Sequence, residues 1–489
     1  ESTASSPPAN ESEHESWWLR AGGGRECLQV AMPLVVSTLS WTILTFIDRM
    51  FLMWVSGAAM AAAFSAGALW FAILCIPLGI CGFANTFVAQ YHGDRQPKQI
   101  GAVVWQSAWI AIACAPMMGV AAMLAPAVFG ASGHTEEVMN HEIEYFQILC
   151  IGGPAMWLCA GLASFYGGRG LTRVNMWVDA GGSAFNAVLD YVLIFGHAGF
   201  PAMGVAGAAW ATNATLWIKA AVYVALLLRR HNQREFGTRA GLRIDRDLCR
   251  RLLSFGFPSG AQMQLDVLGF TAFVILVGRI GAVEFEATGL AFSVSTFAFM
   301  PVWGIGMAGS ILVGQRLGEN EPQLAERSTH TALQVALTYM GCVSLLYLIV
   351  PDAFLYGFFL YADYSPELRD EVYAMAVNLL RFVAAYNMFD AVLMVYVNAL
   401  KGAGDTRYIL KASFVMAIVL AALTWTSVEQ LQWGIYPCWA LVTAWVWVFG
   451  VIFWLRFRGG KWKSMRVIKQ DDVVPEAELT TAEAELAQA

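Results

Sequence analysis

Residues 92–101, HGDRQPKQIG, recur 225 positions later as LGENEPQLAE at residues 317–326. A second pair, GGRGLTR at residues 167–173 and KGAGDTR at residues 401–407, lies 234 positions apart. Similar segments at nearly constant separation indicate that a chain was built from two copies of one unit. The sequence therefore predicts two halves with the same fold, and the character of the intervening segments decides what that fold is.

Those intervening segments are strongly apolar. Apolar residues make up 58% of the 489 residues and charged residues only 13%, against about 45–50% and about 25% in soluble proteins. The apolar residues form runs of roughly 20, the length that a helix needs to cross about 30 Å of hydrocarbon. Hydropathy windows predict twelve transmembrane helices near residues 30–56, 60–88, 102–125, 143–165, 175–196, 203–228, 252–279, 286–315, 328–350, 373–400, 408–427 and 434–456. The predicted fold class is an all-α integral membrane protein.

The domain organisation follows from the repeat and from the longest polar segment between predicted spans. Six helices per half is an even number, so both halves enter the membrane from the same side and an axis along the membrane normal relates them. Two six-helix bundles around a central cleft are typical of a transporter that opens to each side in turn. The predicted units are a disordered N-terminal tail at 1–24, an N-lobe at 25–228, a basic linker at 229–251, a C-lobe at 252–458 and a C-terminal tail at 459–489.

Lysine and arginine gather in alternate loops, including the eight arginines of residues 229–251. Only Arg279 and Arg369 fall in the other set of loops. Because basic loops stay in the cytoplasm, both tails and the linker are predicted to be cytoplasmic, in a multi-pass protein of the plasma (cell inner) membrane. The net charge of −6 comes mostly from acidic tails and points to no nucleic-acid partner. The lipid bilayer is the expected surrounding, and a monomer is the expected state.

The nine cysteines stand singly and mostly inside apolar runs, which argues against zinc sites and a disulfide framework. The chain contains no P-loop, HExxH or GxSxG motif, so ATP-driven export and these hydrolase chemistries are disfavoured. We expect neither an enzyme nor a bound cofactor.

Four carboxylates lie inside predicted spans: Asp48, Asp190, Asp266 and Asp390. Each costs about 2.5–3.5 kcal/mol at the bilayer centre on insertion scales, so each needs a reason to be there. One alternative is that they only hydrogen-bond across helices, each bond contributing about 0.6 kcal/mol. With almost no basic residue in the spans to neutralise them, we favour binding of protons or cations. A site that exchanges a proton, a metal ion and a cationic drug competitively supports antiport.

Polar residues one turn before three of these acids share their helix faces. They are Asn186, Gln262 and Tyr386, each four residues before an aspartate. Methionines such as Met300 and Met388 adapt to varied apolar ligands. Gln262, Tyr386, Met300 and Met388 are therefore candidate residues of a substrate cavity, although a lipid-facing or packing role is the default for each methionine.

This pattern resembles the multidrug and toxic compound extrusion (MATE) family over about residues 25–458. The resemblance is carried by FID at 46–48, NxxxD at 186–190, GVAGAAWAT at 204–212, FGFP at 255–258 and FDAV at 389–392. It implies two six-helix lobes and the export of amphipathic, often cationic, organic compounds against Na⁺ or H⁺ entry.

The resemblance also implies roles for particular residues. Asp48, Asn186, Asp190 and Thr212 match the N-lobe cation site of the family and are the candidate Na⁺ ligands. Asp266 stands where some members have a glutamate, and Asp390 matches an aspartate of a C-lobe cation site. Arg49 stands where the family commonly has a small polar residue. Na⁺ and H⁺ both remain open as the coupling ion.

Two other functions are suggested by parts of this pattern. A lipid-linked saccharide flippase of a related superfamily would need a basic cavity for pyrophosphate, whereas the intramembrane charges here are mostly acidic. An intramembrane aspartyl protease is suggested by GAGD at 402–405. The nearest upstream acid, Asp390, lies about 22 Å away along a helix, which argues against a catalytic pair.

Overall fold

The structure is a computed structural model that describes residues 16–359 and 366–469. These residues form helices, turns and loops, without a strand. The helices are α1 (Gly24–Val55), α2 (Gly57–Gly82), α3 (Ala84–Gly93), α4 (Pro97–Gly130), α5 (Glu136–Gly167), α6 (Thr172–Phe195), α7 (Gly204–Leu227), α8 (Arg230–Phe236), η2 (Ala240–Leu242), α9 (Arg246–Val277), α10 (Ala282–Gly318), α11 (Pro322–Ile349), α12 (Pro351–Phe359), α13 (Pro366–Ala403), α14 (Thr406–Trp425), η3 (Thr426–Gln430), α15 (Ile435–Arg458) and η4 (Lys461–Ser464).

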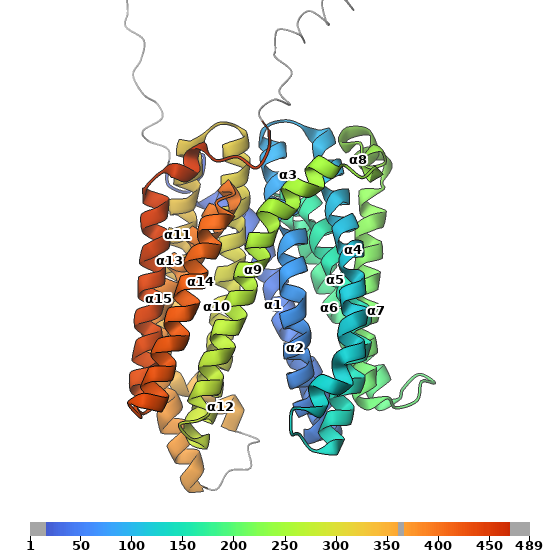
Figure 1. Ribbon diagram of the computed structural model, residues 1–489. Coiled ribbons are helices and arrows are strands. Elements are labelled where there is room, and N and C mark those ends of the chain that lie inside the picture. Colours follow the sequence, from blue (N-terminus) through green and yellow to red (C-terminus); the bar gives the residue numbers. More distant parts are fainter. Residues whose placement is uncertain (1–15, 360–365, 470–489) are drawn as a thin grey trace, which may run out of the picture.

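Eleven helices within the described residues are long and apolar enough to cross a membrane, with α2 and α3 together forming one span. A twelfth is reached if α7 and α8, which meet at 64°, count as one bent span. Figure 1 shows these helices in two bundles: α1–α8, which we call the N-lobe, and α9–α15, which we call the C-lobe. The predicted all-helical membrane fold with two lobes is confirmed.

The predicted repeat is visible in the backbone. Arg95 and Asn320, 225 residues apart, both adopt positive φ angles, 56° and 58°. Gly170 and Gly404, 234 residues apart, do the same at 76° and 95°. Left-handed backbone is uncommon for residues other than glycine. Its recurrence at equivalent positions shows that both halves use the same turns, and the first pair leads into helices that begin with proline, α4 and α11.

The lobes meet at one end of the molecule and diverge toward the other (Figure 1). We call the first the terminal end, because the described chain begins there at residue 16 and ends there at residue 469; it includes the loops at 94–96, 168–171 and 319–321. The opposite or distal end includes the loops at 131–135, 196–203 and 278–281.

Glycines bring the lobes together in the terminal half. A Cβ added at Gly79 of α2 would lie 2.2 Å from the Cα atom of Gly260 in α9. The equivalent contact in the other half pairs Gly304 of α10 with Val35 of α1, where an added Cβ would lie 2.8 Å from the Val35 nitrogen. Helix backbones approach this closely only where the side chain is absent. The interface therefore has the same two-fold relation as the lobes.

Hydrogen bonds across the interface follow the same relation. Gln90 Nε2 of α3 donates to the Gly402 carbonyl over 2.9 Å, and Gln315 Nε2 of α10 donates to the Gly168 carbonyl over 2.8 Å. Because buried amides that lose a partner cost about 1–3 kcal/mol, these paired bonds hold the terminal end together.

Contact between the lobes stops near the middle of the helices. The Thr38 hydroxyl of α1 donates to the Met300 carbonyl of α10 over 3.0 Å. Farther toward the distal end, the described residues form no hydrogen bond or ion pair between α1–α8 and α9–α15. The structure is thus sealed at the terminal end and separated at the distal end.

The first helix of each half crosses from one lobe to the other. Near its start, α1 contributes Cys27 and Leu34 to the hydrophobic core of the C-lobe, and farther along it contributes Leu52 to the core of the N-lobe. In the same way α9 starts in the N-lobe core through Leu248 and ends in the C-lobe core through Phe273. Motion of one lobe against the other must therefore bend or repack α1 and α9.

The structure describes the last part of the predicted N-terminal tail, 1–24, and places it against the C-lobe. Residues 16–23 form turns, Trp17 Nε1 donates to Gln334 Oε1 of α11 over 2.6 Å, and Thr331 donates to the Gly22 carbonyl over 2.7 Å. Residues 1–15 lie outside the described residues. The apolar Trp17 ring and these polar partners fix the turns against the C-lobe, a tertiary effect that local polarity does not reveal.

The C-terminal tail and the linker are also docked. The Val467 amide donates to Gln90 Oε1 over 2.8 Å, so the tail reaches the N-lobe; residues 470–489 lie outside the described residues. In the predicted linker at 229–251, the Thr238 carbonyl accepts from Trp105 Nε1 of α4 over 2.7 Å, and α9 already begins at Arg246. Both segments therefore belong to the closed terminal end.

Candidate functional site

The candidate site lies in the N-lobe, where two aspartates meet. Asp48 of α1 and Asp190 of α6 are 9% and 0% exposed, and their side chains hydrogen-bond one another. Such a bond requires a proton on one of the two carboxyl groups. The helix pair that carries them, α1 and α6, is packed over much of its length, which fixes the two acids side by side.

Asn186 and Thr212 complete this group, which we call the N-lobe acid site. With its amide nitrogen facing the acid, Asn186 donates to Asp190 Oδ2 over 2.9 Å, and its oxygen accepts from the Thr212 backbone nitrogen over 3.2 Å. One turn of α6 separates Asn186 from Asp190, as the NxxxD spacing predicts. All four predicted members therefore lie together, contributed by α1, α6 and α7.

Three buried oxygens of this site have no hydrogen-bond partner among the described residues: Asp48 Oδ1, Asp190 Oδ1 and Thr212 Oγ1. Buried polar atoms are normally satisfied, so an unpaired set marks a place where a proton, a water molecule or an ion fits. Two carboxylates this close in a dry site do not both carry charge without such a partner. The oxygens suit a hard cation such as Na⁺, and the carboxyl pair equally suits a shared proton.

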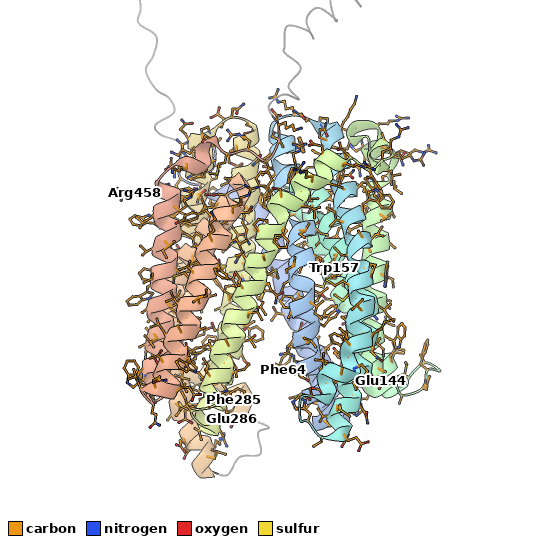
Figure 2. All side chains as sticks on the ribbon, viewed as in Figure 1. Phe64, Glu144, Trp157, Phe285, Glu286 and Arg458 are labelled. Carbon is orange, nitrogen blue, oxygen red and sulfur yellow. The ribbon has the colours of Figure 1, made fainter. Side chains whose placement is uncertain are left out.

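Two residues next to the site were not among the predicted members. Tyr145 of α5 is 7% exposed and lies within electrostatic reach of both Asp48 and Asp190. Arg49 forms no ion pair with Asp48; its guanidinium lies over the Phe64 ring of α2, 5.1 Å from the centroid. Figure 2 shows Phe64 in the distal half of the N-lobe. Adjacent helix residues diverge by about 100°, which explains why Arg49 lies within electrostatic reach of Asp48 without pairing with it directly.

The C-lobe acids are arranged differently. Gln262 of α9 donates to Asp266 one turn along the same helix, as their spacing predicts. Asp266 is exposed on the surface of α9, and Lys401 of α13 lies within electrostatic reach without a direct ion pair. The sequence placed Lys401 in a cytoplasmic loop, whereas α13 extends through it to Ala403. A basic group near Asp266 was therefore missed.

Asp390 stands apart from Asp266. It is half-buried on α13, and no described side chain pairs with it. Tyr386, one turn before, forms a 3.2 Å hydrogen bond with Ser295 of α10. The C-lobe therefore holds two separate carboxyl groups and not a counterpart of the N-lobe acid site.

The predicted substrate-cavity residues are scattered. Gln262 donates to Asp266, and Tyr386 is hydrogen-bonded to Ser295. The Met300 carbonyl accepts the hydrogen bond from Thr38, the contact between the lobes that lies nearest the distal end. Met388 packs into the C-lobe core and faces Gly341 of α11. The structure does not gather the four into one lining, and their role in binding stays a prediction.

Another buried carboxyl group was not predicted. Glu142 of α5 is fully buried, and its Oε1 contacts both the Ser65 hydroxyl of α2 and His134 Nδ1, the latter over 2.9 Å. The other oxygen, Oε2, has no partner among the described residues. The prediction that the fourth span starts at residue 143 placed this residue just outside the membrane, whereas α5 begins at Glu136.

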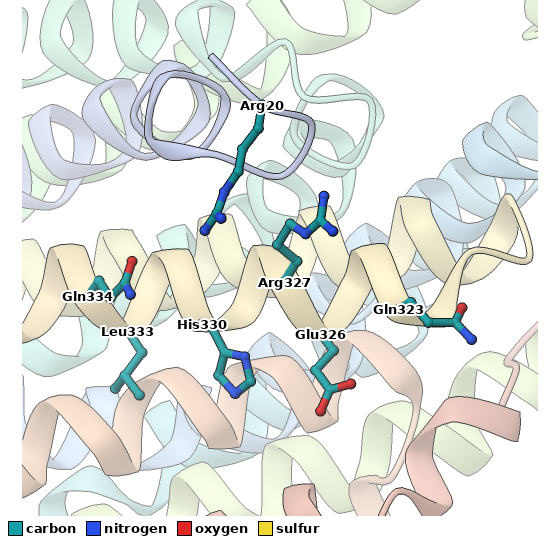
Figure 3. Close-up of a pocket in the computed structure, with 7 residues that line it drawn as sticks. All are labelled: Arg20, Gln323, Glu326, Arg327, His330, Leu333 and Gln334. Carbon is teal, nitrogen blue, oxygen red and sulfur yellow. The ribbon is translucent and has the colours of Figure 1, made fainter. Parts of the chain in front are cut away.

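The other features of the described residues that could suggest a site are weaker candidates than these acids. Within residues 16–359 and 366–469, no cluster of three or more His, Cys, Asp or Glu side chains could hold a metal ion. Asp405 of the GAGD sequence is ion-paired with Arg456 over 2.7 Å, so it serves the packing of α15. Figure 3 shows a surface pocket beside α11 at the terminal end, lined partly by Arg20 and Arg327, which is remote from the N-lobe acid site.

Comparison with known proteins identifies relatives along most of the chain. The sequence model of the MatE family matches twice, at residues 33–192 and 258–426. The chain is 28% identical over 395 residues to the multidrug resistance protein PmpM of Pseudomonas aeruginosa, covering 78% of this chain and 79% of that protein. It is 26% identical over 422 residues to the multidrug resistance protein NorM of Aliivibrio fischeri, covering 84% and 89%.

Solved structures show the same fold. A MOP superfamily transporter from Pyrococcus furiosus matches with a TM-score of 0.81 at 17% identity, over 90% of this chain and 97% of the other. The eukaryotic MATE transporter AtDTX14 matches with a TM-score of 0.78 at 16% identity, over 90% and 96%. At this identity the likeness concerns the arrangement of the helices alone.

Proposed function

Because the chain belongs to the MATE family of multidrug efflux transporters, we propose that it exports amphipathic, often cationic, organic compounds in exchange for an entering cation, Na⁺ or H⁺. The observation that carries the coupling part is the N-lobe acid site. It holds two buried carboxyl groups in contact, with three unpaired oxygens around them. A site of this kind changes its charge when it takes up or releases a cation.

The position of Asp48 suggests how that charge change moves the protein. Asp48 lies on the distal half of α1, while the start of the same helix belongs to the C-lobe core. Uptake of a cation removes the repulsion between Asp48 and Asp190, so α1 can pack more closely on α6. We propose that this repacking pulls on the interlobe contact at Thr38 and alters how the lobes meet.

Alternating access is the motion that fits this arrangement. The terminal end is sealed by the glycine contacts, whereas the lobes separate toward the distal end (Figure 1). With the basic loops in the cytoplasm, the terminal end faces the cell interior of a plasma (inner) membrane. The described conformation would then release substrate to the outside.

In this proposal the C-lobe acids receive the substrate. Asp266 is exposed, and Asp390 is half-buried without a described ionic partner. A carboxylate at the edge of a low-dielectric site attracts an organic cation more strongly than one in bulk water. The N-lobe and C-lobe acids thus have separate tasks, one binding the coupling cation and the other the drug.

Transport by purified protein in proteoliposomes tests the proposal, with Na⁺ and pH gradients imposed separately and ethidium as the substrate. We expect one gradient to drive ethidium movement and the other to have little effect. Asp48→Asn and Asp190→Asn should each abolish the driven transport. The control Asp370→Asn removes an exposed carboxylate of α13 at the distal end and should transport as the parent does.

The outcomes separate the parts of the proposal. Driven transport at the parent rate in both N-lobe variants would rule out the acid site as the coupling site. Ethidium movement that responds to neither gradient would rule out cation exchange itself. A variant counts only if its unfolding temperature and its yield in the membrane match those of the parent.

A further inference from the structure

The buried Glu142 has no part in the function proposed so far, yet a carboxyl group inside a transmembrane bundle demands an account. It is fully buried on the distal part of α5, with Ser65 on one side and His134 on the other. His134 belongs to the loop at 131–135, and its side chain is 44% exposed. Glu142 is therefore shielded from water but joined to it through one imidazole ring.

From Glu142, α5 runs inward toward the N-lobe acid site. Tyr145 lies three residues after Glu142, so the two share a helix face about 4.5 Å apart along the axis. Tyr145 in turn lies within electrostatic reach of Asp48 and Asp190. Exposed imidazole, buried carboxyl, buried phenol and acid pair thus follow one another from the distal surface to the N-lobe acid site.

We propose that His134 and Glu142 deliver protons from the distal surface to the Asp48–Asp190 pair. The inference rests on the proposed function, with H⁺ as the coupling ion. The His134 imidazolium gives a proton to the Glu142 carboxylate and is recharged from water. Glu142 then passes that proton inward, through the Tyr145 hydroxyl or a water molecule beside it, to whichever aspartate is ionised. Each step moves one proton between named groups and leaves the donor ready for the next.

The surroundings of Glu142 fit this role. Its unpaired Oε2 leaves one oxygen free for an inward partner while Oε1 holds His134 and Ser65. A carboxyl group kept only for packing would have both oxygens satisfied. The titratable and charged groups around this route are His134 from the loop, Tyr145 from α5, Asp48 and Arg49 from α1, and Asp190 from α6; α2 adds the Ser65 hydroxyl.

The test makes three measurements on the purified protein in proteoliposomes: pH-driven ethidium movement, ethidium exchange and ethidium binding. Ethidium movement driven by a pH gradient needs net proton flow. Exchange of internal for external ethidium needs no net proton flow, and ethidium binding needs neither proton flow nor transport. In Glu142→Gln, we expect the driven rate to fall by at least about tenfold, as for loss of a proton-transfer group. Ethidium exchange and the ethidium Kd should stay within about twofold of the parent values.

Two further variants distinguish proton transfer from structure. Glu142→Asp keeps a carboxyl group and should recover part of the driven rate. His134→Gln should slow the driven mode, and added imidazole should restore it by replacing the lost ring. The matched control is His141→Gln, which removes the histidine adjacent to Glu142 on α5 and should behave as the parent.

Several outcomes would overturn the inference. They are a parent-like driven rate in Glu142→Gln, an equal loss of driven transport, exchange and binding in that variant, or a defect in His141→Gln as large as that in His134→Gln. Failure of the proposed function looks different, because the parent protein itself would then respond to neither a pH gradient nor a Na⁺ gradient. A parent driven by the Na⁺ gradient alone would keep the proposed function and overturn this inference.

Discussion

The close contact between α2 and α9 allows a direct test of which end of the molecule opens. We predict that Gly79→Ala weakens the closed terminal end. The added Cβ would lie 2.2 Å from the Gly260 Cα atom and 2.5 Å from its nitrogen. Ordinary contact begins near 3.4 Å, so the backbones must separate locally by the difference, 1.2 Å. Backbone atoms cannot rotate away as a flexible side chain does.

Overpacking of this kind costs about 1–3 kcal/mol. The cost applies only while the terminal end is closed, because separated lobes have room for the methyl group. The gain of about 1 kcal/mol in helix propensity is the same in both arrangements and cancels. The ratio of opened to closed molecules should therefore rise by roughly five- to 150-fold.

Electron–electron distance measurements in lipid nanodiscs provide the assay. Spin labels replace Lys98 and Gln323, exposed residues at the starts of α4 and α11 that are related by the repeat, on a background without the native cysteines. We expect a longer distance to gain population in Gly79→Ala. The matched control is Gly67→Ala on the same helix, where an added Cβ meets nothing within 4 Å. Equal distance distributions in the two variants, with unchanged unfolding temperatures, would refute the reasoning.

Three further predictions rest on other contacts. Gly304→Ala, the counterpart in the second half, should open the same end in the same distance measurement, since its Cβ would lie 2.8 Å from the Val35 nitrogen; an unchanged distribution would contradict the two-fold interface. Val467→Asp should lower the unfolding temperature by burying a charge in the N-lobe core, at a cost of a few kcal/mol, whereas Val467→Leu should not. Lys219→Met should destabilise the N-lobe by about 1–3 kcal/mol, because it leaves the half-buried Asp179, its 2.7 Å partner, without a cation. Thermal unfolding of this variant is compared with that of the double variant Lys219→Met and Asp179→Leu. If the double variant is no more stable than the single one, loss of the ion pair is not the cause.

Much of this architecture follows from the sequence because its signals are strong. Runs of apolar residues fix the spans, and the repeated loops fix the two halves, down to the left-handed backbone at Arg95 and Asn320. The four residues that the sequence assigns to the N-lobe site do lie together, and their binding of a cation stays a prediction. Asn186 and Asp190 share a helix face by spacing alone, while the addition of Thr212 depended on the family resemblance.

Other features depend on tertiary packing that spacing does not encode. Glu142 was missed because the start of the fourth span was placed one residue after it, an ordinary boundary error for a polar first turn. Lys219 of the predicted span 203–228 pairs with Asp179 of the span 175–196, a contact between helices that residue spacing does not reveal. Lys401 was assigned to a loop although it lies near Asp266.

The scaffold repeats but its chemistry does not. At the offset of 225, the counterpart of Asp48 is Phe273, and the counterpart of Asp266 is Trp41. Phe273 is a core residue of the C-lobe. Both halves therefore share the contacts that join them, whereas within the described residues the paired acid site lies in the first half alone.

The crossing of α1 and α9 has a consequence for biosynthesis. The N-lobe core includes Leu248 from the second half and Val467 from the C-terminal segment. A ribosome that has released only the first six spans has therefore made a bundle whose interior still lacks some of its side chains. The N-lobe therefore cannot complete its core before the second half is synthesised, and its packing in the bilayer stays incomplete until the segment that contains Val467 has been made.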